Sequence, residues 1–451
     1  MSTQGSPRKP FANVLVASLT GTSLEWYDFF LYSTAAALIL GKVFFPSSDP
    51  AIGTLLSLAT FGVGFIARPV GAAFFGVFGD RFGRKPTVMA TLALMGLATA
   101  AIGVLPGYAT LGLWAPVLLV ILRLLQGFAA GAQFAGSTVY AVEYAPSGRR
   151  GLFGGMSSSG LYVGVLLSSG IFALFQMLPA AEFQSWGWRV PFLLSLVLVA
   201  VTLVIRSRLD ETPEFTQEVR EAGDAPAGTN GGFRVVAPLL STFRYQWRSV
   251  LIIICVVAAP FTATYAYQTY SLSYLTDNLH VGGSIGSVSL TIASAVAIVV
   301  VPLAAALSDK IGRRPVLIIG SVFSALFAFP FFWLLATKTG VGITFAMIGG
   351  TGIGVPFILG AQGAMLSERF SAHNRFTGFG MGRELGSVLF AGLTPVISDV
   401  LVSAANGRSW PVSVYVILAC VITIIVGFAI KETNPGRPVA ERPAAPVVAR
   451  G

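Results

Sequence analysis

Charged side chains inside long apolar runs are the residues of this chain best placed to do chemistry. Glu25 and Asp28 lie three positions apart, so they share one face if their run forms a helix. Carboxylates in such surroundings are costly and mark functional sites by default. A carboxyl that takes up and releases a proton there can carry that proton through the protein, which is the role we predict for at least one of Asp28 and Glu25. The alternative is a static pair held by an arginine that joins two helices.

Three arginines lie in the same kind of apolar run: Arg68, Arg123 and Arg383, the last followed directly by Glu384. A guanidinium binds a carboxylate through two parallel hydrogen bonds, so each arginine is a candidate to bind an anionic substrate. Arg68 can instead form an ion pair with Glu25. Arg383 and Glu384 can instead pair with each other or form a feature that sets specificity.

The run that holds Arg123 carries a stripe of polar side chains. On an ideal helix the members of this stripe share one face: Arg123, Gln126, Ala130, Gln133, Ser137 and Tyr140. A polar stripe on an apolar helix faces the interior of a bundle or water, not lipid. We therefore predict that its polar members line a substrate cavity, and Arg123 can also neutralise Asp28.

Tyrosines also recur at helical spacing in the second half of the chain. Tyr267, Tyr270 and Tyr274 fall on one face, and Gln268 lies beside them. Aromatic rings with polar tips suit a small polar solute, including a cation, so we predict that this face lines the cavity. An aromatic belt at the membrane interface is the alternative. Tyr162 is a weaker candidate for the cavity wall.

A charged pattern occurs twice. Each copy has an aspartate followed by basic residues, and further on a glutamate that precedes an arginine by seven residues. The residues of the two copies are Asp80, Arg81, Arg84, Glu143, Arg150, Asp309, Arg313, Glu368 and Arg375. We predict that they form latches at the cytoplasmic end, through ion pairs and through carboxylate contacts with helix N-termini. Control of topology by positive loops is the alternative.

Nearly everything between these residues is apolar. The chain is 54% hydrophobic and 11% charged, whereas a soluble domain has about 25% charged residues. Apolar runs of about 20 residues, the length that crosses a bilayer as a helix, recur along the chain. We predict an all-α membrane protein with twelve transmembrane helices, at 12–40, 53–79, 87–106, 111–142, 151–179, 189–207, 247–277, 284–308, 315–337, 341–367, 376–404 and 411–430.

The repeated pattern divides these helices into two pseudo-repeats of six. We predict an N-terminal six-helix bundle at 1–207, a cytoplasmic linker at 208–246, a C-terminal six-helix bundle at 247–430 and a disordered cytoplasmic tail at 431–451. Duplicated bundles around a central site are typical of transporters that rock between two states.

Loop charges indicate orientation and exclude several functions. The net charge of +10 comes largely from basic residues in alternate loops, the positive-inside bias of a protein with both termini in the cytoplasm. We therefore predict the cytoplasmic (inner) membrane and no nucleic-acid partner. Cys255 and Cys420 lie in apolar runs, so we expect no disulfide, no metal and no cofactor. The sequence contains no nucleophile–base pair of the kind that would indicate an enzyme. A channel would not need paired latches. We expect the protein to be a monomer.

Several segments carry a resemblance to known transporters. The runs DRFGRK at 80–85 and RLLQG at 123–127 resemble the signature loop and the fourth-helix motif of the major facilitator superfamily. Three further runs resemble its metabolite:proton symporter family: GTSLEWYDFFLY at 21–32, FGVGFIARPVG at 61–71 and AVEYAPSGRRG at 141–151. The resemblance covers nearly the whole chain.

The resemblance implies the major facilitator fold and a pairing of Asp28 with Arg123, which makes Asp28 the first candidate for the coupling proton and Glu25 the second. The family includes proton-coupled importers of shikimate, 2-oxoglutarate, citrate and other carboxylates, and of proline and betaine. This chain departs from the family at two places. It has Gln133 where the fourth helix usually carries a glutamate, and Arg383 and Glu384 near where the eleventh helix usually carries tyrosine followed by asparagine or glutamine.

These observations together predict a proton-coupled symporter that imports a small organic acid, such as shikimate or a di- or tricarboxylate, by alternating access. The buried arginines favour an anion. Uptake of a zwitterionic osmolyte such as proline or betaine is the alternative, as is export of a drug or metabolite. Sodium coupling is also open, although carboxylates beside arginines suit protons better.

Overall fold

The computed structural model describes residues 11–46, 50–82, 84–131, 133, 145, 148–207, 247–368 and 372–432. The predicted linker, nearly all of the predicted tail and two predicted site residues, Tyr140 and Glu143, lie outside this part of the chain. The side chains of four predicted latch residues also lie outside the description: Asp80, Arg81, Arg84 and Arg375.

The described residues of the first half fold into helices. They are α1 (Phe11–Ala35), η1 (Ala36–Leu40), α2 (Gly41–Phe44), α3 (Pro50–Phe82), α4 (Arg84–Val104), α5 (Tyr108–Leu111), α6 (Trp114–Ala130), α8 (Arg150–Gln176), α9 (Ala180–Glu182), η2 (Phe183–Gly187) and α10 (Arg189–Ser207). The η segments are π-helical turns that continue the neighbouring α-helices.

The second half begins with a helix at 247–256. Its other elements are α13 (Ala258–Thr264), η3 (Tyr265–Tyr270), α14 (Ser271–Ser273), η4 (Tyr274–Asn278), α15 (Gly283–Ile311), α16 (Arg313–Ala336), α17 (Gly340–Met347), η5 (Ile348–Gly354), α18 (Val355–Ser367), α19 (Ala372–Ser387), η6 (Val388–Gly392), α20 (Thr394–Ala404) and α21 (Trp410–Ala429).

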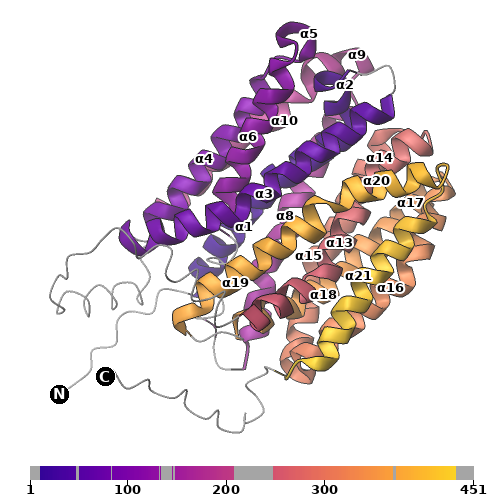
Figure 1. The fold of residues 1–451 in the computed structure, drawn as a ribbon. Helices are drawn as coiled ribbons and strands as arrows, with labels where there is room; N and C mark the ends of the chain where they lie inside the picture. The colour runs from indigo at the N-terminus through magenta and orange to yellow at the C-terminus, as the bar shows by residue number, and fades with distance from the viewer. Residues whose placement is uncertain are drawn as a thin grey trace, which may run out of the picture.

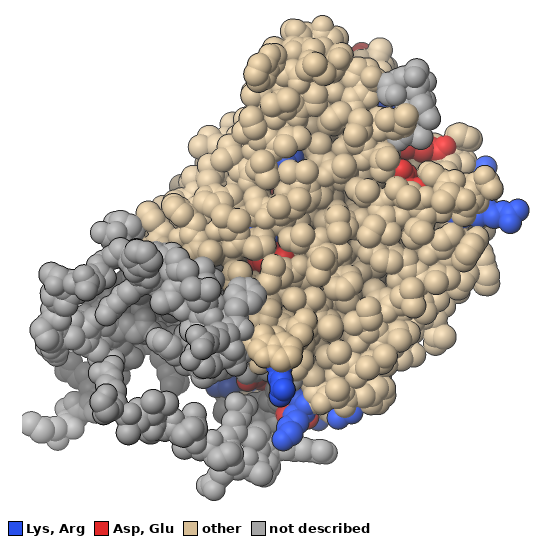
Figure 2. Space-filling model, viewed as in Figure 1, with Lys and Arg blue, Asp and Glu red and all other residues tan. Residues whose placement is uncertain are grey.

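The predicted all-α membrane class is confirmed. Within the described residues, ten helices are long and apolar enough to cross a membrane, and the bent pair Ala180–Gly187 and Arg189–Ile205 forms an eleventh. Trp114–Ala130 is a shorter apolar helix at the place of the predicted fourth span. On the face that Figure 2 shows, charged side chains gather mostly at the two ends of the bundle, with a broad band of uncharged atoms between them.

The helices form two groups that lie side by side (Figure 1), one from α1 to α10 and the other from α13 to α21. The groups meet along two seams. At one seam α8 packs against α15 and α18, and at the other α3 packs against α19 and η6. The interior between these seams is where side chains from both halves can meet.

A close crossing of α3 and α6 positions two of the predicted arginines. A Cβ added at Gly127 would lie 1.7 Å from the carbonyl oxygen of Gly64, so only glycine permits this approach. Arg123 lies one turn before Gly127, and Arg68 lies one turn after Gly64. The crossing therefore brings both guanidinium groups into the same part of the interior.

Candidate functional site

Charged residues from both halves converge in the interior of the bundle. Glu25 of α1, Arg68 of α3, and Arg383 and Glu384 of α19 all act electrostatically on the hydroxyl of Tyr265, the first residue of η3. Each of these four charged residues is at most 3% exposed. We call Glu25, Arg68, Tyr265, Arg383 and Glu384 the central cluster.

The central cluster contains an ion pair that joins the two halves. Nη1 of Arg68 lies 3.6 Å from Oε2 of Glu384. The sequence left open a pair of Arg68 with Glu25, and the structure instead gives Arg68 the glutamate of α19, because α3 packs directly against α19. Glu384 also accepts a hydrogen bond from Nη1 of Arg383. Arg383 and Glu384 thus pair with each other, which is one of the two alternatives that the sequence left open.

Arg68 is surrounded by aromatic rings more than by polar atoms. Its guanidinium carbon lies 4.4 Å from the ring centre of Phe29 and 4.8 Å from that of Phe65. No described residue forms a hydrogen bond with any of its three side-chain nitrogens. Rings stabilise a desolvated guanidinium through cation–π contact but leave its N–H groups available to an anion.

Arg123 is held within the first half. It donates hydrogen bonds from Nη1 to Oε1 of Gln126 (2.8 Å) and from Nη2 to the carbonyl oxygen of Phe61 (3.0 Å). Its guanidinium carbon lies 3.9 Å from the ring centre of Tyr32. The predicted pairing of Arg123 with Asp28 is absent from the described residues, since the guanidinium already has these closer partners.

Asp28 is buried inside the first half and is 1% exposed. Neither of its carboxyl oxygens has a hydrogen-bond partner among the described side chains and backbone. Thr99 lies close enough to act on it, but the Thr99 hydroxyl donates to the carbonyl oxygen of Met95 (2.9 Å) and accepts from Nε2 of Gln126 (2.7 Å). Both oxygens of Asp28 are therefore available to bind a proton.

A small cavity lies beside the central cluster. Its volume is about 10 Å³, enough for a single water molecule. Residues from both halves line it: Trp26, Ser158, Leu161, Phe261, Thr264, Tyr265, Leu359, Gln362 and Arg383. The site is thus closed in this structure and has no room for an organic acid without movement of the side chains.

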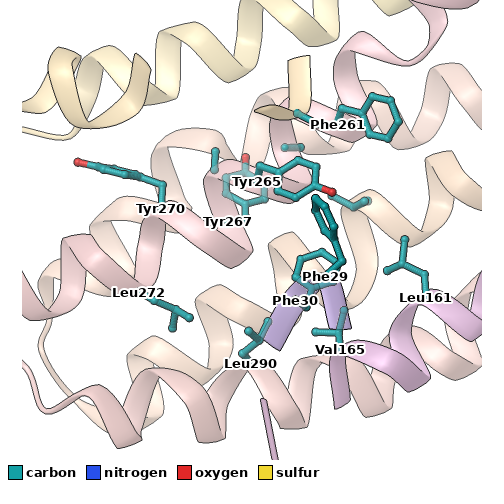
Figure 3. Packing of buried hydrophobic residues seen from close by; sticks show 14 of the residues in the cluster. Phe29, Phe30, Leu161, Val165, Phe261, Tyr265, Tyr267, Tyr270, Leu272 and Leu290 are labelled. Carbon is teal, nitrogen blue, oxygen red and sulfur yellow. The ribbon is translucent and has the colours of Figure 1, made fainter. Parts of the chain in front are cut away.

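The tyrosine that faces this cavity is not one of those selected from the sequence. Figure 3 shows Tyr265 lying against Phe29 and Phe30 of α1, while Tyr270 points away from them; the Tyr265 and Phe30 rings stack at 5.9 Å. Tyr267 stacks on Phe331 at 4.2 Å, within the second half. Tyr270 and Tyr274 lie together, with ring centres 6.1 Å apart, but the predicted face of Tyr267, Tyr270 and Tyr274 does not line this cavity, because Tyr265 and Tyr267 are two positions apart and point to opposite sides of the helix.

Three further residues predicted to line a cavity are Gln133, Tyr162 and Gln268, and they do not line this small one. Gln133 donates from Nε2 to the hydroxyl of Thr91 (2.9 Å), so it joins two helices of the first half. Tyr162 and Gln268 are buried, and their polar side-chain atoms have no hydrogen-bond partner among the described residues. None of the three is among the residues that line the cavity beside Arg383.

At one end of the bundle, the second charged pattern forms a compact network. Asp309 accepts hydrogen bonds from the backbone N–H groups of Gly151 and Leu152, at 2.8 Å each. These N–H groups open α8, which belongs to the other half. Arg313 donates to Asp309 (2.7 Å) and lies 3.4 Å from Glu368. The exposed Arg150 lies next to this contact in sequence. We call this end the latch end.

At the other end, neutral hydroxyl groups join the halves. Ser33 of α1 and Thr269 of η3 share a hydrogen bond of 2.5 Å, and Ser169 of α8 and Thr291 of α15 share one of 2.9 Å. The halves are thus in contact on both sides of the central cluster. Within the part of the chain that the structure describes, no group of three or more histidine, cysteine, aspartate or glutamate side chains could hold a metal ion.

Comparisons with known proteins agree with this geometry. Residues 13–441 match the family model described as "Sugar (and other) transporter". The chain is 36% identical to the shikimate transporter of Escherichia coli K12, over 93% of this chain and 94% of that protein. It is also 36% identical to the proline/betaine transporter of Salmonella typhimurium, over 93% of this chain and 83% of that protein.

The fold has solved counterparts. The xylose transporter XylE of E. coli, in a partially occluded inward open conformation, superposes with a TM-score of 0.70 at 17% identity, over 94% of this chain and 98% of XylE. At this identity the likeness shows the fold alone, and it is the fold that the resemblance implies. This protein is a multi-pass transporter of the cytoplasmic membrane and not an enzyme, and the chain belongs to the sugar (and other) transporter family of the major facilitator superfamily.

Proposed function

We propose that the protein is a proton-coupled symporter that imports a small organic acid by alternating access. The observation that carries this proposal is that the guanidinium of Arg68 has N–H groups without a hydrogen-bond partner among the described residues. This guanidinium is fully buried, it lies between the halves, and no described residue accepts a hydrogen bond from its nitrogens. A buried cation with unused N–H groups is best completed by a carboxylate, which can accept two hydrogen bonds at once.

In this proposal the substrate's carboxylate binds between Arg68 and Arg383, and aromatic rings enclose the rest of the molecule. Trp26, Phe261 and Tyr265 line the cavity beside Arg383. Such rings suit a compact, partly apolar ring or chain. The substrate would therefore combine at least one carboxylate with a small carbon skeleton, as shikimate does.

Asp28 and Glu25 supply the proton-binding groups. Asp28 lies on α1, one helical turn after Glu25, and both are buried. A proton on Asp28 removes a charge from the first half, while Glu25 acts on Arg383 of the second half. Protonation of the two carboxyls can therefore change how the halves attract each other and how strongly the arginines attract an anion.

Uptake of a zwitterionic osmolyte is the second candidate, and one feature favours it. The cavity wall is aromatic, and a quaternary ammonium group binds to aromatic faces through cation–π contact. One relative, as similar in sequence to this chain as the shikimate transporter is, is a proline/betaine transporter. Because a zwitterion also carries a carboxylate, Arg68 and Arg383 fit either substrate.

The purified protein in proteoliposomes with an internal pH dye tests both candidates. Shikimate, 2-oxoglutarate, citrate, proline and betaine would be added one at a time. We expect one of the acids to acidify the lumen, whereas acidification by betaine or proline alone would select the second candidate. Uptake of a radiolabelled compound without acidification would contradict proton coupling.

A further inference from the structure

The carboxylate of Glu384 is held as a bound substrate would be held. Its Oε1 accepts a hydrogen bond from Arg383, and its Oε2 lies 3.6 Å from Nη1 of Arg68. Oε2 also accepts a hydrogen bond of 3.1 Å from the hydroxyl of Ser387. One carboxylate thus faces two guanidinium groups, one from each half of the molecule, at a position that is 2% exposed.

This arrangement uses only part of what Arg68 offers. A charge-assisted N–H···O⁻ hydrogen bond measures about 2.7–2.9 Å, and Arg68 approaches Glu384 only to 3.6 Å. A guanidinium has five N–H donors, and those of Arg68 have no hydrogen-bond partner in the described part of the chain. Glu384 therefore occupies the space between the arginines without satisfying Arg68.

The space beside this carboxylate is too small for a second one. The cavity that Arg383 lines holds one water molecule, and the rings of Phe29 and Phe65 cover Arg68. A substrate carboxylate that reaches both guanidinium groups must take the place of the Glu384 carboxylate. Two carboxylates in contact there would also repel each other.

The geometry points to a carboxylate-binding site shared by Arg68 and Arg383, which the chain's own Glu384 fills when no substrate is present. An incoming organic acid displaces Glu384 and takes over the contact between the halves. The identity of that acid rests on the proposed function, but the existence of the site does not. In the empty carrier, Glu384 takes the place of the substrate in the contact between α3 and α19 and offsets the charge of the arginines.

Replacement of the internal carboxylate by a free one tests the site directly. Glu384→Ala should lose thermal stability, and sodium acetate should restore it. At high millimolar acetate, compared with sodium chloride at equal ionic strength, we expect the Tm of the detergent-solubilised variant to rise by roughly 2 °C or more. Acetamide, which has the same shape without the charge, should have no effect. A variant that folds only in the presence of acetate would also support the site.

Two controls keep this test specific. The wild-type protein should respond much less to acetate than Glu384→Ala does, because acetate must first displace Glu384. Asp399→Ala removes another carboxylate from the same transmembrane span, at a half-buried position in α20, and should respond no more than the wild type does. An equal response to acetate and chloride in Glu384→Ala, or the same response in Asp399→Ala, would overturn the inference.

Substrate binding gives a second test with a milder variant. Glu384→Gln keeps the volume of the side chain and removes the competing charge, so it should bind shikimate, or another acid that the wild type imports, about tenfold more tightly. Weaker or unchanged binding would overturn the displacement. If the wild type imports none of the acids, the proposed function fails, and the acetate experiment still decides whether the carboxylate site exists.

Discussion

Two buried arginines, one at the latch end and one in the central cluster, show how differently the same side chain is used in this protein. Arg313 donates from Nη1 to Ser308 (2.9 Å) and Asp309 (2.7 Å), and its Nη2 lies 3.4 Å from Glu368. Arg68 has aromatic rings around it and one carboxylate at 3.6 Å. Both side chains are 1% exposed or less, so burial does not distinguish them.

The difference lies in how many of their N–H groups are used. A buried charge without hydrogen bonds is expensive, and proteins retain such a group where it serves a function. The latch arginine uses both of its terminal nitrogens in contacts with its own chain, which suits a closed gate. The central arginine is left with unused donors, which suits a site that a ligand completes.

The same conservative substitution at both positions gives the largest expected effect. Lysine keeps the charge but loses the planar fork that binds a carboxylate through two hydrogen bonds. We expect Arg68→Lys to lower the initial rate of uptake by about 100-fold or more, and Arg313→Lys to lower it by less than about tenfold. Radiolabelled uptake into proteoliposomes measures both. Equal losses in the two variants would break the comparison.

Asp28→Asn separates proton binding from substrate binding. We expect it to abolish accumulation driven by a pH gradient, a loss of about 10-fold or more, because the amide cannot take up the coupling proton. Exchange of external for internal substrate at equal pH should remain, since Arg68 and Arg383 are unchanged. Glu25→Gln, measured in parallel, shows which carboxyl carries the proton. Loss of folded protein in Asp28→Asn would instead make this residue structural.

The latch should control rates more than affinity. Asp309→Asn weakens the contact with the N-terminus of α8 and removes the charge beside Arg313. Hydrogen bonds to charged groups contribute about 1.5–3 kcal/mol, enough to shift the balance between the two states of the carrier. We expect turnover to change by about tenfold, with KM within about twofold.

Two variants outside the described side chains, Glu143→Gln and Arg375→Ala, should act in the same direction as Asp309→Asn. They test whether Glu143 of the first copy and Arg375 of the second copy of the charged pattern contribute to the same gate. Unchanged turnover together with a large loss of affinity in any of these three variants would rule out a latch.

The smallest effect is expected at the opposite end. Ser33→Ala removes one neutral hydrogen bond to Thr269, and such bonds contribute about 0.5–1.5 kcal/mol. We expect uptake to change by about threefold or less, and Ser169→Ala to behave alike. An effect as large as that of Asp309→Asn would mean that closure of both ends depends on interactions of similar strength.

The apolar runs already determine most of the fold. A helix that crosses lipid must satisfy its own backbone and present apolar side chains, so each span is visible in the local composition. The contacts among Asp309, Arg313 and Glu368 could likewise be predicted from the charged pattern, since these residues lie at or near the ends of helices at one end of the bundle. The deep positions of Glu25 and Asp28 followed from their place within the first run.

Only the tertiary structure decided which of these charges meet. Arg68 pairs with Glu384, 316 positions later in the chain, because α3 packs against α19, and no local spacing encodes that contact. Tyr265 and not Tyr267 lines the cavity because residues two positions apart point to opposite sides of a helix, and the packing of this helix against α1 decides which side faces the cavity. The sequence thus determines which residues are costly to bury, whereas the packing of the two halves decides which partner offsets that cost.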